Sequence, residues 1–454
     1  MIISNKMKIN EKYLVKDNSI IKDVLNNLKN SAIGISMVVN KKKSVVGVIT
    51  DGDIRKKLLQ GYTLQDKCTV CMNKNFLFLK SGYKREEALK LFDSKIKQVP
   101  VLDNKKQLIE IIKSPKELEL TTRSVRAQSP ARISLSGGGT DFSKYFLKSK
   151  GSSLLITTNL YARVLVTKRD DSKIIIISED FRITRKFENY EALKKNKDKK
   201  LSLIIASILR MKPKFGFKIQ INCDFKPSSG LGGSAAVIAS TISSIAKLQQ
   251  FDLNKYEISE LAFEIERLDL GIKGGWQDQY GTVFGGLCKI EFSRKHNIVY
   301  PINIDENILK EFRERIILCN LKTKHLGKKI QNINQENLDQ KLNIKFRNIA
   351  SDILKELLTE NYDKVGRLFD IAWKLKKQKN QSVSNKFINE LYSKAIDIGA
   401  LGGRLLGTGG GGHFLFYVNS DKKQILLNML KKNKVEIINF DFTSKGTQSW
   451  IVKK

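Results

Sequence analysis

One glycine-rich stretch, Pro227–Ala236, limits the fold of this chain more than any other feature, and it reads PSSGLGGSAA. It follows Phe217–Asn222, whose alternating apolar residues are typical of a half-buried strand, and it leads into Ser234–Gln250, whose apolar residues have helical spacing. A strand, a glycine-rich turn and a helix in this order direct backbone N–H groups and the positive helix end towards an anion. No Gly-Lys-Ser/Thr follows at the Walker spacing. By itself, the stretch also fits a plain strand-to-helix turn.

We interpret this stretch as a phosphate-binding loop. Its glycines allow the backbone to turn tightly and to approach a phosphate without a Cβ in the way. The hydroxyl of Ser234 would lie near the bound phosphates, where a magnesium ion usually sits. The predicted phosphate-binding residues are Pro227, Ser228, Ser229, Gly230, Leu231, Gly232, Gly233, Ser234 and Ala235.

The net charge of +36 suggests a nucleic-acid partner, but the distribution of the charge argues against one. The lysines are spread over all 454 residues, without a basic region that contains interleaved aromatic residues. We interpret them as solvated surface residues, which would also attract small anionic substrates. No apolar run reaches the length of a membrane span. We therefore expect a cytoplasmic protein that binds neither nucleic acid nor a membrane.

The five cysteines, an odd number in a large chain, indicate reduced thiols rather than disulfides. Cys68 and Cys71 form a C-x-x-C pair, but no second pair completes a zinc site. We interpret this spacing as chance, with redox or metal chemistry as the alternative.

Residues 20–120 contain a weak internal repeat with an offset of 63 residues. Two predicted hairpins, Gly34–Ile49 and Gln98–Ile112, are each preceded by a helical pattern, at Ile20–Leu28 and Arg85–Phe92. One such unit is too small to bury a core, whereas a pair is large enough.

This repeat resembles a tandem CBS module, most specifically in Gly47–Ile54, which reads GVITDGDI. The resemblance implies that Thr50 and Asp53 hold the ribose of a regulatory adenine nucleotide, since a carboxylate accepts both ribose hydroxyls. The alternative is a pairing platform that binds no ligand. The second copy is degenerate, because the expected Gly, Thr and Asp are replaced by Glu110, Lys113 and Lys116.

A second glycine-rich motif lies in Arg126–Phe142, where a short strand around Arg132–Leu135 runs into GGGTD. Asp141 at its end either caps a turn or accepts hydrogen bonds from sugar hydroxyls, which the close backbone approach would admit.

Three further stretches contain candidate site residues. Glu266 lies at the edge of the buried face of a predicted helix, Tyr256–Leu268, and is either a solvated flank residue or a magnesium ligand. Asp278 stands between two glutamines in the glycine-rich stretch Gly271–Gly286, which suits a residue held close to a substrate. Gly399–Gly412 is too glycine-rich for a regular element, so we expect a loop packed against the phosphate site.

The polar stretch Lys113–Val125 predicts a domain boundary. We expect three domains, at residues 1–122, 123–300 and 301–454, the last of them containing a second α/β region, Ile308–Phe440. Helical patterns at Leu338–Leu358 and Phe387–Ala395, and strands at Gly412–Val418 and Val435–Phe440, are predicted within that region.

Three motifs in order, Pro130–Asp141, Pro227–Ala236 and Gly402–Gly412, resemble those of the GHMP small-molecule kinases over about residues 123–454. The resemblance implies an α/β (α+β) chain, with a two-domain GHMP kinase fold preceded by a CBS-pair domain. The variants GGGTD and GGWQDQYGTVFGG look most like those of heptose 7-phosphate kinases, although fucokinase-like relatives share much of the pattern. Heptose 7-phosphate kinases transfer the γ-phosphoryl of ATP to the anomeric hydroxyl of D-glycero-D-manno-heptose 7-phosphate. Their product, the 1,7-bisphosphate, is a precursor of nucleotide-activated heptose for surface polysaccharide.

The resemblance also implies roles for individual residues, with ATP and Mg²⁺ as cofactors. Asp278 matches the catalytic aspartate, and Arg132 matches the arginine that would stabilise its ionised form. Two departures from the family pattern are Gly233, where a serine is common, and Trp276, where a lysine is usual. The implied magnesium ligands are Ser234 and Glu266, and the implied sugar-binding residues are Gly139, Thr140 and Asp141.

The alternatives are a kinase of another sugar, such as fucose, and a non-catalytic CBS–pseudokinase that senses a nucleotide. The joint presence of Ser234, Glu266 and Asp278 argues against the second, because an inactive relative usually loses one of them. Whichever of these functions the protein has, we expect a homo-oligomer.

Overall fold

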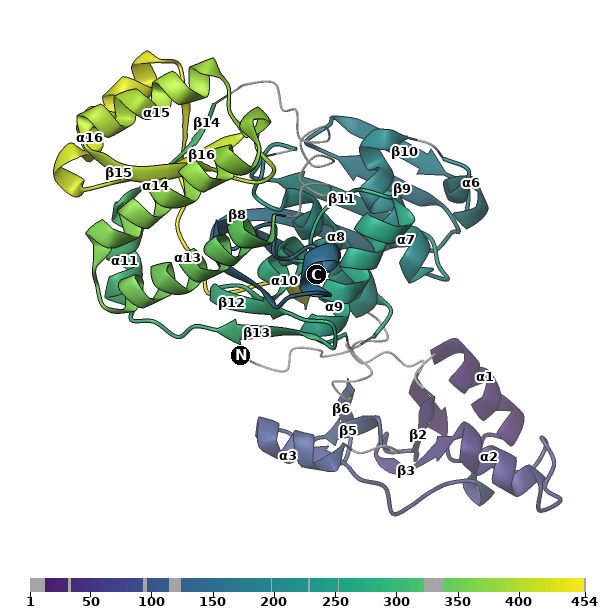
Figure 1. Ribbon diagram of the computed structural model, residues 1–454. Helices are drawn as coiled ribbons and strands as arrows, with labels where there is room; N and C mark the ends of the chain where they lie inside the picture. Colours follow the sequence, from purple (N-terminus) through teal and green to yellow (C-terminus); the bar gives the residue numbers. More distant parts are fainter. Residues whose placement is uncertain are drawn as a thin grey trace. The chain divides into compact units, whose positions relative to one another are not determined.

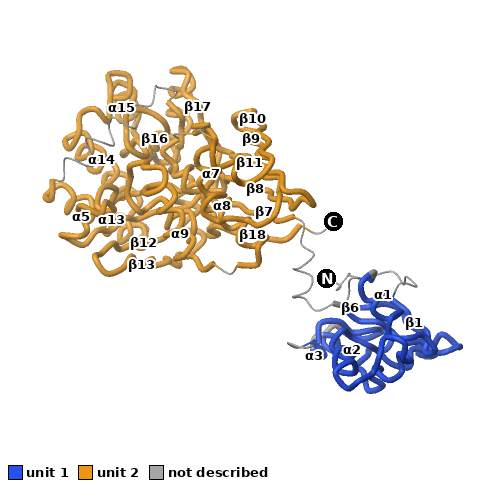
Figure 2. Tube along the Cα trace, turned by 90° about the vertical axis from the view of Figure 1, so that its right-hand side faces the viewer, with its two compact units in different colours: residues 1–122 blue, residues 123–454 orange. Residues whose placement is uncertain are grey.

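The structure is a computed structural model that describes residues 13–31, 34–92, 96–113, 124–196, 198–227, 229–251, 253–321 and 339–452. The chain divides into two compact units, residues 1–122 and 123–454 (Figure 2). The further division of the second unit after residue 300 stays a prediction. In the described part of the chain, we find no helix with the length and apolar character of a membrane span.

The smaller unit contains the same backbone arrangement twice. In each copy the first strand is parallel to the second, and the second is antiparallel to the third. The register is also repeated, because Ile35 faces Thr50 and Gln98 faces Lys113. The predicted 63-residue repeat is thereby confirmed. The first copy consists of β1 (Leu14–Lys16), α1 (Ile21–Ser31), β2 (Ile35–Val39) and β3 (Val45–Thr50), and the second of β4 (Leu79–Lys80), α3 (Arg85–Leu91), β5 (Gln98–Leu102) and β6 (Leu108–Lys113).

The two copies share a core. Met37 and Val45 of the first copy form one buried cluster with Leu102 and Ile111 of the second. A short helix, α2 (Asp51–Leu58), follows β3, and the turn η2 (Cys68–Val70) contains Cys68 as a buried free thiol. The segment that would correspond to α2 in the second copy lies outside the described residues.

The larger unit is built on an eight-stranded sheet whose centre is the long strand β8 (Gly151–Lys168). β8 is antiparallel to β7 (Ser124–Ser136), to β11 (Phe217–Cys223) and to β12 (Leu287–Phe292). The sheet is completed by β9 (Ile174–Ser178), β10 (Ile183–Phe187), β13 (Asn297–Pro301) and β18 (Gln448–Ile451).

Helix α8 (Gly233–Leu248) packs on β7 and β8 (Figure 1). It can approach them closely because its residues are small: Ser240 Oγ lies 2.8 Å from Ser129 Oγ and 2.9 Å from the Ala162 carbonyl. The other helical segments around this sheet are α5 (Ser143–Phe146), α6 (Tyr190–Lys194), η3 (Lys199–Leu201), α7 (Ser202–Met211), α9 (Lys255–Phe263), the π-helical turn η4 (Glu264–Asp269) and α10 (Gln277–Phe284).

A second, four-stranded antiparallel sheet follows, in the order β15-β16-β14-β17. Helix α13 contacts β7 and β8 of the first sheet and also α14, which packs on β15 (Figure 1). These elements are α11 (Glu306–Glu314), β14 (Ile316–Asn320), α13 (Gln340–Leu358), α14 (Tyr362–Lys379), η5 (Gln381–Val383), α15 (Lys386–Ile398), β15 (Ala400–Leu405), β16 (His413–Val418), α16 (Ser420–Lys432) and β17 (Glu436–Ile438). The predicted mixed α/β class is confirmed.

The prediction that Gly399–Gly412 is a loop throughout is wrong, because its first half forms β15. The glycines in this strand serve close packing: a Cβ at Gly402 would lie 2.1 Å from the Gly366 carbonyl oxygen of α14. The last strand of the chain, β18, returns to the first sheet and pairs with β7.

Candidate active site

The predicted phosphate loop ends at the N-terminus of α8. Gly232 is the N-cap with φ 73°, and no side chain in the described part of the chain caps this helix end. Among these residues, the N–H groups of the first turn therefore have no side-chain acceptor, as an anion site requires.

Contacts from both sheets hold this loop in place. The backbone N–H of Arg132 donates to the Leu231 carbonyl at 2.9 Å, and His413 Nδ1 lies 2.8 Å from the Ser229 carbonyl. A Cβ at Gly230, which has φ 78°, would lie 2.7 Å from the Leu406 carbonyl oxygen. The segment after β15 is thus packed against the phosphate loop, as the sequence predicts. Ser228 lies outside the described residues.

Gly233, one of the two departures from the family pattern, has a steric explanation. A Cβ at this position would lie 2.6 Å from the ring of Phe225. The aromatic ring occupies the space that a serine side chain would need.

Arg132 connects the predicted catalytic aspartate to the phosphate loop. Its Nε and Nη2 donate to Asp278 Oδ1 at 3.1 and 2.6 Å, while its Nη1 donates to the Gly230 carbonyl at 2.7 Å. Arg132 is on β7 and is 3% exposed, whereas Asp278 is in the first turn of α10 and is 21% exposed. The carboxylate therefore has a fixed orientation and remains accessible.

The two predicted magnesium ligands lie together. Ser234 Oγ donates to Glu266 Oε1 at 2.5 Å, and Gln279 Nε2 donates to Glu266 Oε2 at 2.6 Å. Glu266 is 2% exposed, so it is not a solvated flank residue. Burial raises the pKa of its carboxyl, while the neighbouring Arg267 guanidinium, 3.2 Å away, opposes this shift.

Asp141 lies at the tip of the first glycine-rich loop and both caps that loop and lines the pocket. Its Oδ1 accepts from the Gly139 N–H at 2.9 Å and its Oδ2 from the Gln277 N–H at 3.3 Å. Burial, followed by the charge of Asp278, raises the pKa of this carboxyl. A Cβ at Gly275 would lie 1.9 Å from Asp141 Oδ2, so only glycine fits there.

Thr140 is fully buried and does not face the pocket. Its hydroxyl lies 2.8 Å from the Gly137 carbonyl and 2.9 Å from the Ser152 carbonyl, which share its one proton, and it accepts from the Ser152 N–H. This corrects the prediction that Thr140 holds sugar hydroxyls, because its hydroxyl already fixes the loop to β8.

Trp276, the second departure, packs away from the pocket. Its indole stacks on Phe263 with ring centroids 3.5 Å apart, and its N–H donates to Ser143 Oγ at 3.1 Å. Its neighbour Gln277 lines the pocket instead, and its Oε1 accepts from Ser134 Oγ at 3.0 Å.

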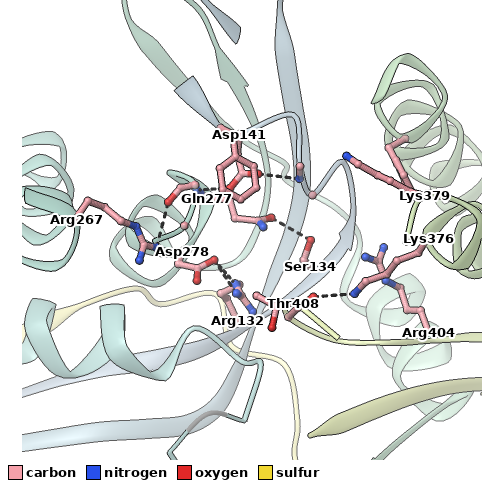
Figure 3. Close-up of a pocket in the computed structure, with 17 residues that line it drawn as sticks. Arg132, Ser134, Asp141, Arg267, Gln277, Asp278, Lys376, Lys379, Arg404 and Thr408 are labelled. Carbon is pink, nitrogen blue, oxygen red and sulfur yellow. Dashed lines mark hydrogen bonds and ion pairs between the residues drawn. The ribbon is translucent and has the colours of Figure 1, made fainter. Parts of the chain in front are cut away.

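A basic wall, formed by Lys376, Lys379 and Arg404, lies opposite Asp278 in the pocket (Figure 3). Lys376 Nζ donates to the Leu405 and Gly407 carbonyls at 2.8 and 2.7 Å. Burial lowers the pKa of Lys376, as do the charges of Arg404 and Arg132. The complete lining is Arg132, Ser134, Gly138, Gly139, Asp141, Phe142, Arg267, Gly274, Gly275, Gln277, Asp278, Phe346, Lys376, Lys379, Arg404, Gly407 and Thr408.

The sequence interpretation missed this wall because it missed α14. A signal was present: Val365, Leu368, Phe369, Ala372 and Trp373 are buried and recur at helical spacing. The roles of the lysines carry no comparable signal, since α14 contains five lysines among its 18 residues.

The candidate nucleotide site of the smaller unit is held by local contacts. Thr50 is the N-cap of α2, and Asp53 Oδ2 accepts from the Thr50 N–H and hydroxyl at 2.9 and 2.6 Å. In the second copy, Glu110 stands at the place of Gly47 and accepts from the Tyr83 hydroxyl at 3.2 Å. Lys113 is described only in its backbone, and Lys116 lies outside the described residues.

Three family models match the chain. The GHMP kinase N-terminal domain matches residues 201–286, the GHMP kinase C-terminal domain matches residues 353–436, and the CBS domain matches residues 9–60.

Individual proteins match over the larger unit. The D-glycero-α-D-manno-heptose 7-phosphate kinase of Campylobacter jejuni is 34% identical over 72% of this chain and 99% of its own length. A structure titled D-glycero-D-manno-heptose 1-phosphate kinase from Bacteroides thetaiotaomicron has a TM-score of 0.62 and 26% identity, over 73% of this chain and all of that one. A structure titled putative sugar kinase from C. jejuni has a TM-score of 0.61 and 32% identity, over 73% of this chain and 99% of that one. With a CBS domain at its N-terminus, this chain belongs to the GHMP kinase family.

Proposed function

We propose that this protein is an ATP-dependent kinase of the anomeric hydroxyl of D-glycero-D-manno-heptose 7-phosphate. The product would be the 1,7-bisphosphate, for nucleotide-activated heptose and surface polysaccharide. One observation carries the kinase assignment: a single arginine, Arg132, binds both Asp278 and the phosphate loop. The sugar assignment is supported by the name of the C. jejuni relative.

This arrangement supports the proposal, because a proton acceptor would lie next to the site of the transferred phosphoryl group. Asp278 would accept the proton of the anomeric hydroxyl, and Arg132 would keep the carboxylate oriented towards it. The uncapped first turn of α8 would bind the phosphate oxygens of ATP.

Ser234 and Glu266 fit a magnesium ion chemically, because both supply oxygen, the ligand that Mg²⁺ prefers. Their side-chain oxygens are 2.5 Å apart, so both can reach one cation. Among the described residues there is no cluster of three or more His, Cys, Asp or Glu that would bind a metal without a nucleotide. The ion would neutralise phosphate charge, as it does in phosphoryl transfer generally.

The charge of the pocket supports an anionic sugar. Five basic side chains line it, those of Arg132, Arg267, Lys376, Lys379 and Arg404, against the two carboxylates of Asp141 and Asp278. A nucleotide together with a sugar phosphate would supply the missing negative charge.

An ADP-release assay over a panel of sugars tests the proposal. The panel contains D-glycero-D-manno-heptose, its 7-phosphate and 1-phosphate, fucose, galactose and mevalonate. We expect the highest kcat/KM with the 7-phosphate. Preference for fucose would establish the alternative sugar kinase. Preference for the 1-phosphate would mean that the sugar receives its 1-phosphate before its 7-phosphate, the reverse of the proposed order. No turnover would favour the pseudokinase.

We propose a separate role for the smaller unit, in which Thr50 and Asp53 bind one adenine nucleotide per chain. The matching CBS model and the intact first copy support this, whereas Glu110 fills the equivalent place in the second. The homo-oligomer stays a prediction.

A further inference from the structure

We propose that Lys379 and Asn343 bind the phosphate group that the sugar substrate already carries, and thereby select a sugar phosphate over the free sugar. The inference rests on the proposed function and adds to it two residues outside the three motifs.

The two residues form a contact between α13 and α14. Lys379 Nζ, in the last turn of α14, donates to Asn343 Oδ1 at 2.7 Å. Asn343 is fully buried, and its Nδ2 has no hydrogen-bond partner among the described residues. Phe346, three residues further along α13, lines the pocket, so Asn343 is on the helix face that is turned to it.

The glycine-rich loop opposite approaches this pair closely. A Cβ at Gly139, which has φ 96°, would lie 3.3 Å from Lys379 Nζ and 3.6 Å from Asn343 Oδ1. A buried donor without an acceptor is costly, and a phosphate oxygen is the acceptor that both an ammonium and an amide N–H would accommodate.

Asp141 lies between this pair and the catalytic aspartate. The charge of Asp278 contributes to the raised pKa of Asp141, and the charge of Asp141 in turn opposes the lowering of the pKa of Lys379 by burial. Figure 3 shows Asp278 and Lys379 on opposite sides of Asp141. A sugar whose ring hydroxyls contact Asp141 would thus present its anomeric hydroxyl at one end and a distal phosphate at the other.

The other members of the basic wall have different partners. Lys376 donates to the two carbonyls that fix the segment against the phosphate loop, and Arg404 Nη1 donates to the Leu135 carbonyl at 2.6 Å. Within the described residues, Lys379 donates a hydrogen bond only to the neutral side-chain amide of Asn343. A bound phosphate would therefore be its strongest partner.

Steady-state kinetics of the full chain tests the proposal. Lys379→Met should raise KM for heptose 7-phosphate by about 10- to 100-fold, the effect of a lost charge-assisted hydrogen bond. KM for ATP and kcat/KM for unphosphorylated heptose should change by less than about twofold. Lys379→Arg should restore part of the preference. Lys374→Met is the matched control, since Lys374 is exposed on the same helix and pairs with Asp370.

A second measurement does not depend on which sugar is the substrate. With a non-hydrolysable ATP analogue and Mg²⁺ at saturation, calorimetry should detect inorganic phosphate binding to the wild type and to Lys374→Met, but not to Lys379→Met. Asn343→Leu, which removes the second donor, should weaken that binding. Thermal unfolding of each variant confirms that it is folded.

The outcomes separate this inference from the proposed function. If the wild type turns over none of the panel sugars, the proposed function fails, while phosphate binding that requires Lys379 still supports the site. If Lys379→Met keeps the preference for phosphorylated sugar, or binds phosphate as the wild type does, the inference is wrong. A rise confined to KM for ATP would also overturn it, because Lys379 would then contact the nucleotide.

Discussion

Two aspartates that the sequence singles out, Asp53 in the smaller unit and Asp278 in the larger one, are held in different ways. Asp53 bonds only three residues away, to Thr50, in a capping box that many helices use at their start. Asp278 pairs with Arg132, which is 146 residues away and almost fully buried. A local contact is explained by the helix alone. A long-range ion pair that removes an arginine from water is costly, and only the tertiary fold holds it together.

The largest expected effect is at Asp278. Asp278→Asn should lower kcat by about 10²- to 10⁴-fold, the usual contribution of a general base, and leave ATP binding nearly unchanged. Single-turnover kinetics and calorimetry with an ATP analogue measure the two quantities. Asp171→Asn removes a surface carboxylate that also pairs with an arginine, and should have little effect on kcat. Turnover of Asp278→Asn within a few-fold of wild type would remove Asp278 from the mechanism.

The next effect concerns the metal. Ser234→Ala and Glu266→Gln should each raise the Mg²⁺ concentration for half-maximal rate by about tenfold or more, because each weakens an oxygen ligand of a hard cation. Magnesium titrations at saturating ATP measure this. Glu264→Gln, in the same π-helical turn but paired with Arg210 at the surface, is the control. Unchanged metal dependence in both variants would leave Glu266 with only its structural contacts.

A smaller effect is expected at Asp141, whose raised pKa has a consequence for stability. In the folded protein this carboxyl binds its proton at a higher pH than in the unfolded chain. The wild type should therefore gain stability relative to Asp141→Asn as the pH falls from 7 towards the unfolded value of about 4, by about 1.4 kcal/mol in total for each unit by which the pKa is raised. Urea unfolding across this range measures the difference.

Asp171→Asn provides the opposite sign at lower pH. The Arg169 guanidinium lowers the pKa of Asp171, so the wild type should lose stability relative to that variant as the pH falls through the unfolded value of about 4. Slopes of equal sign for the two variants would contradict the assignment of a raised pKa to Asp141.

The smallest expected effect is at Asp53. Asp53→Ala should lower the free energy of unfolding of the smaller unit by about 1 kcal/mol through loss of the capping box. It should also abolish AMP binding to the full chain, measured by calorimetry. Asp51→Ala, which removes an exposed partner of Arg55 in the same helix turn, is the matched control. Intact AMP binding in Asp53→Ala would leave the smaller unit as a pairing platform.

The sequence by itself determined the features that depend on neighbours in the chain. The glycine-rich turn into α8, the 63-residue repeat and the helical segment containing Glu266 all follow from spacing and glycine content. These signals are reliable because the backbone conformation of a glycine-rich turn, or the periodicity of a buried helix face, is set within a few residues.

Only the tertiary structure decided which polar groups face the pocket. Thr140 belongs to a motif, yet its hydroxyl is used by the backbone of β8, while Lys379 belongs to no motif and lines the site. β15 forms although its sequence is rich in glycine, because those glycines allow α14 to pack against it. In each case the deciding contact joins residues far apart in the chain, and the energies of such contacts are not encoded in local spacing.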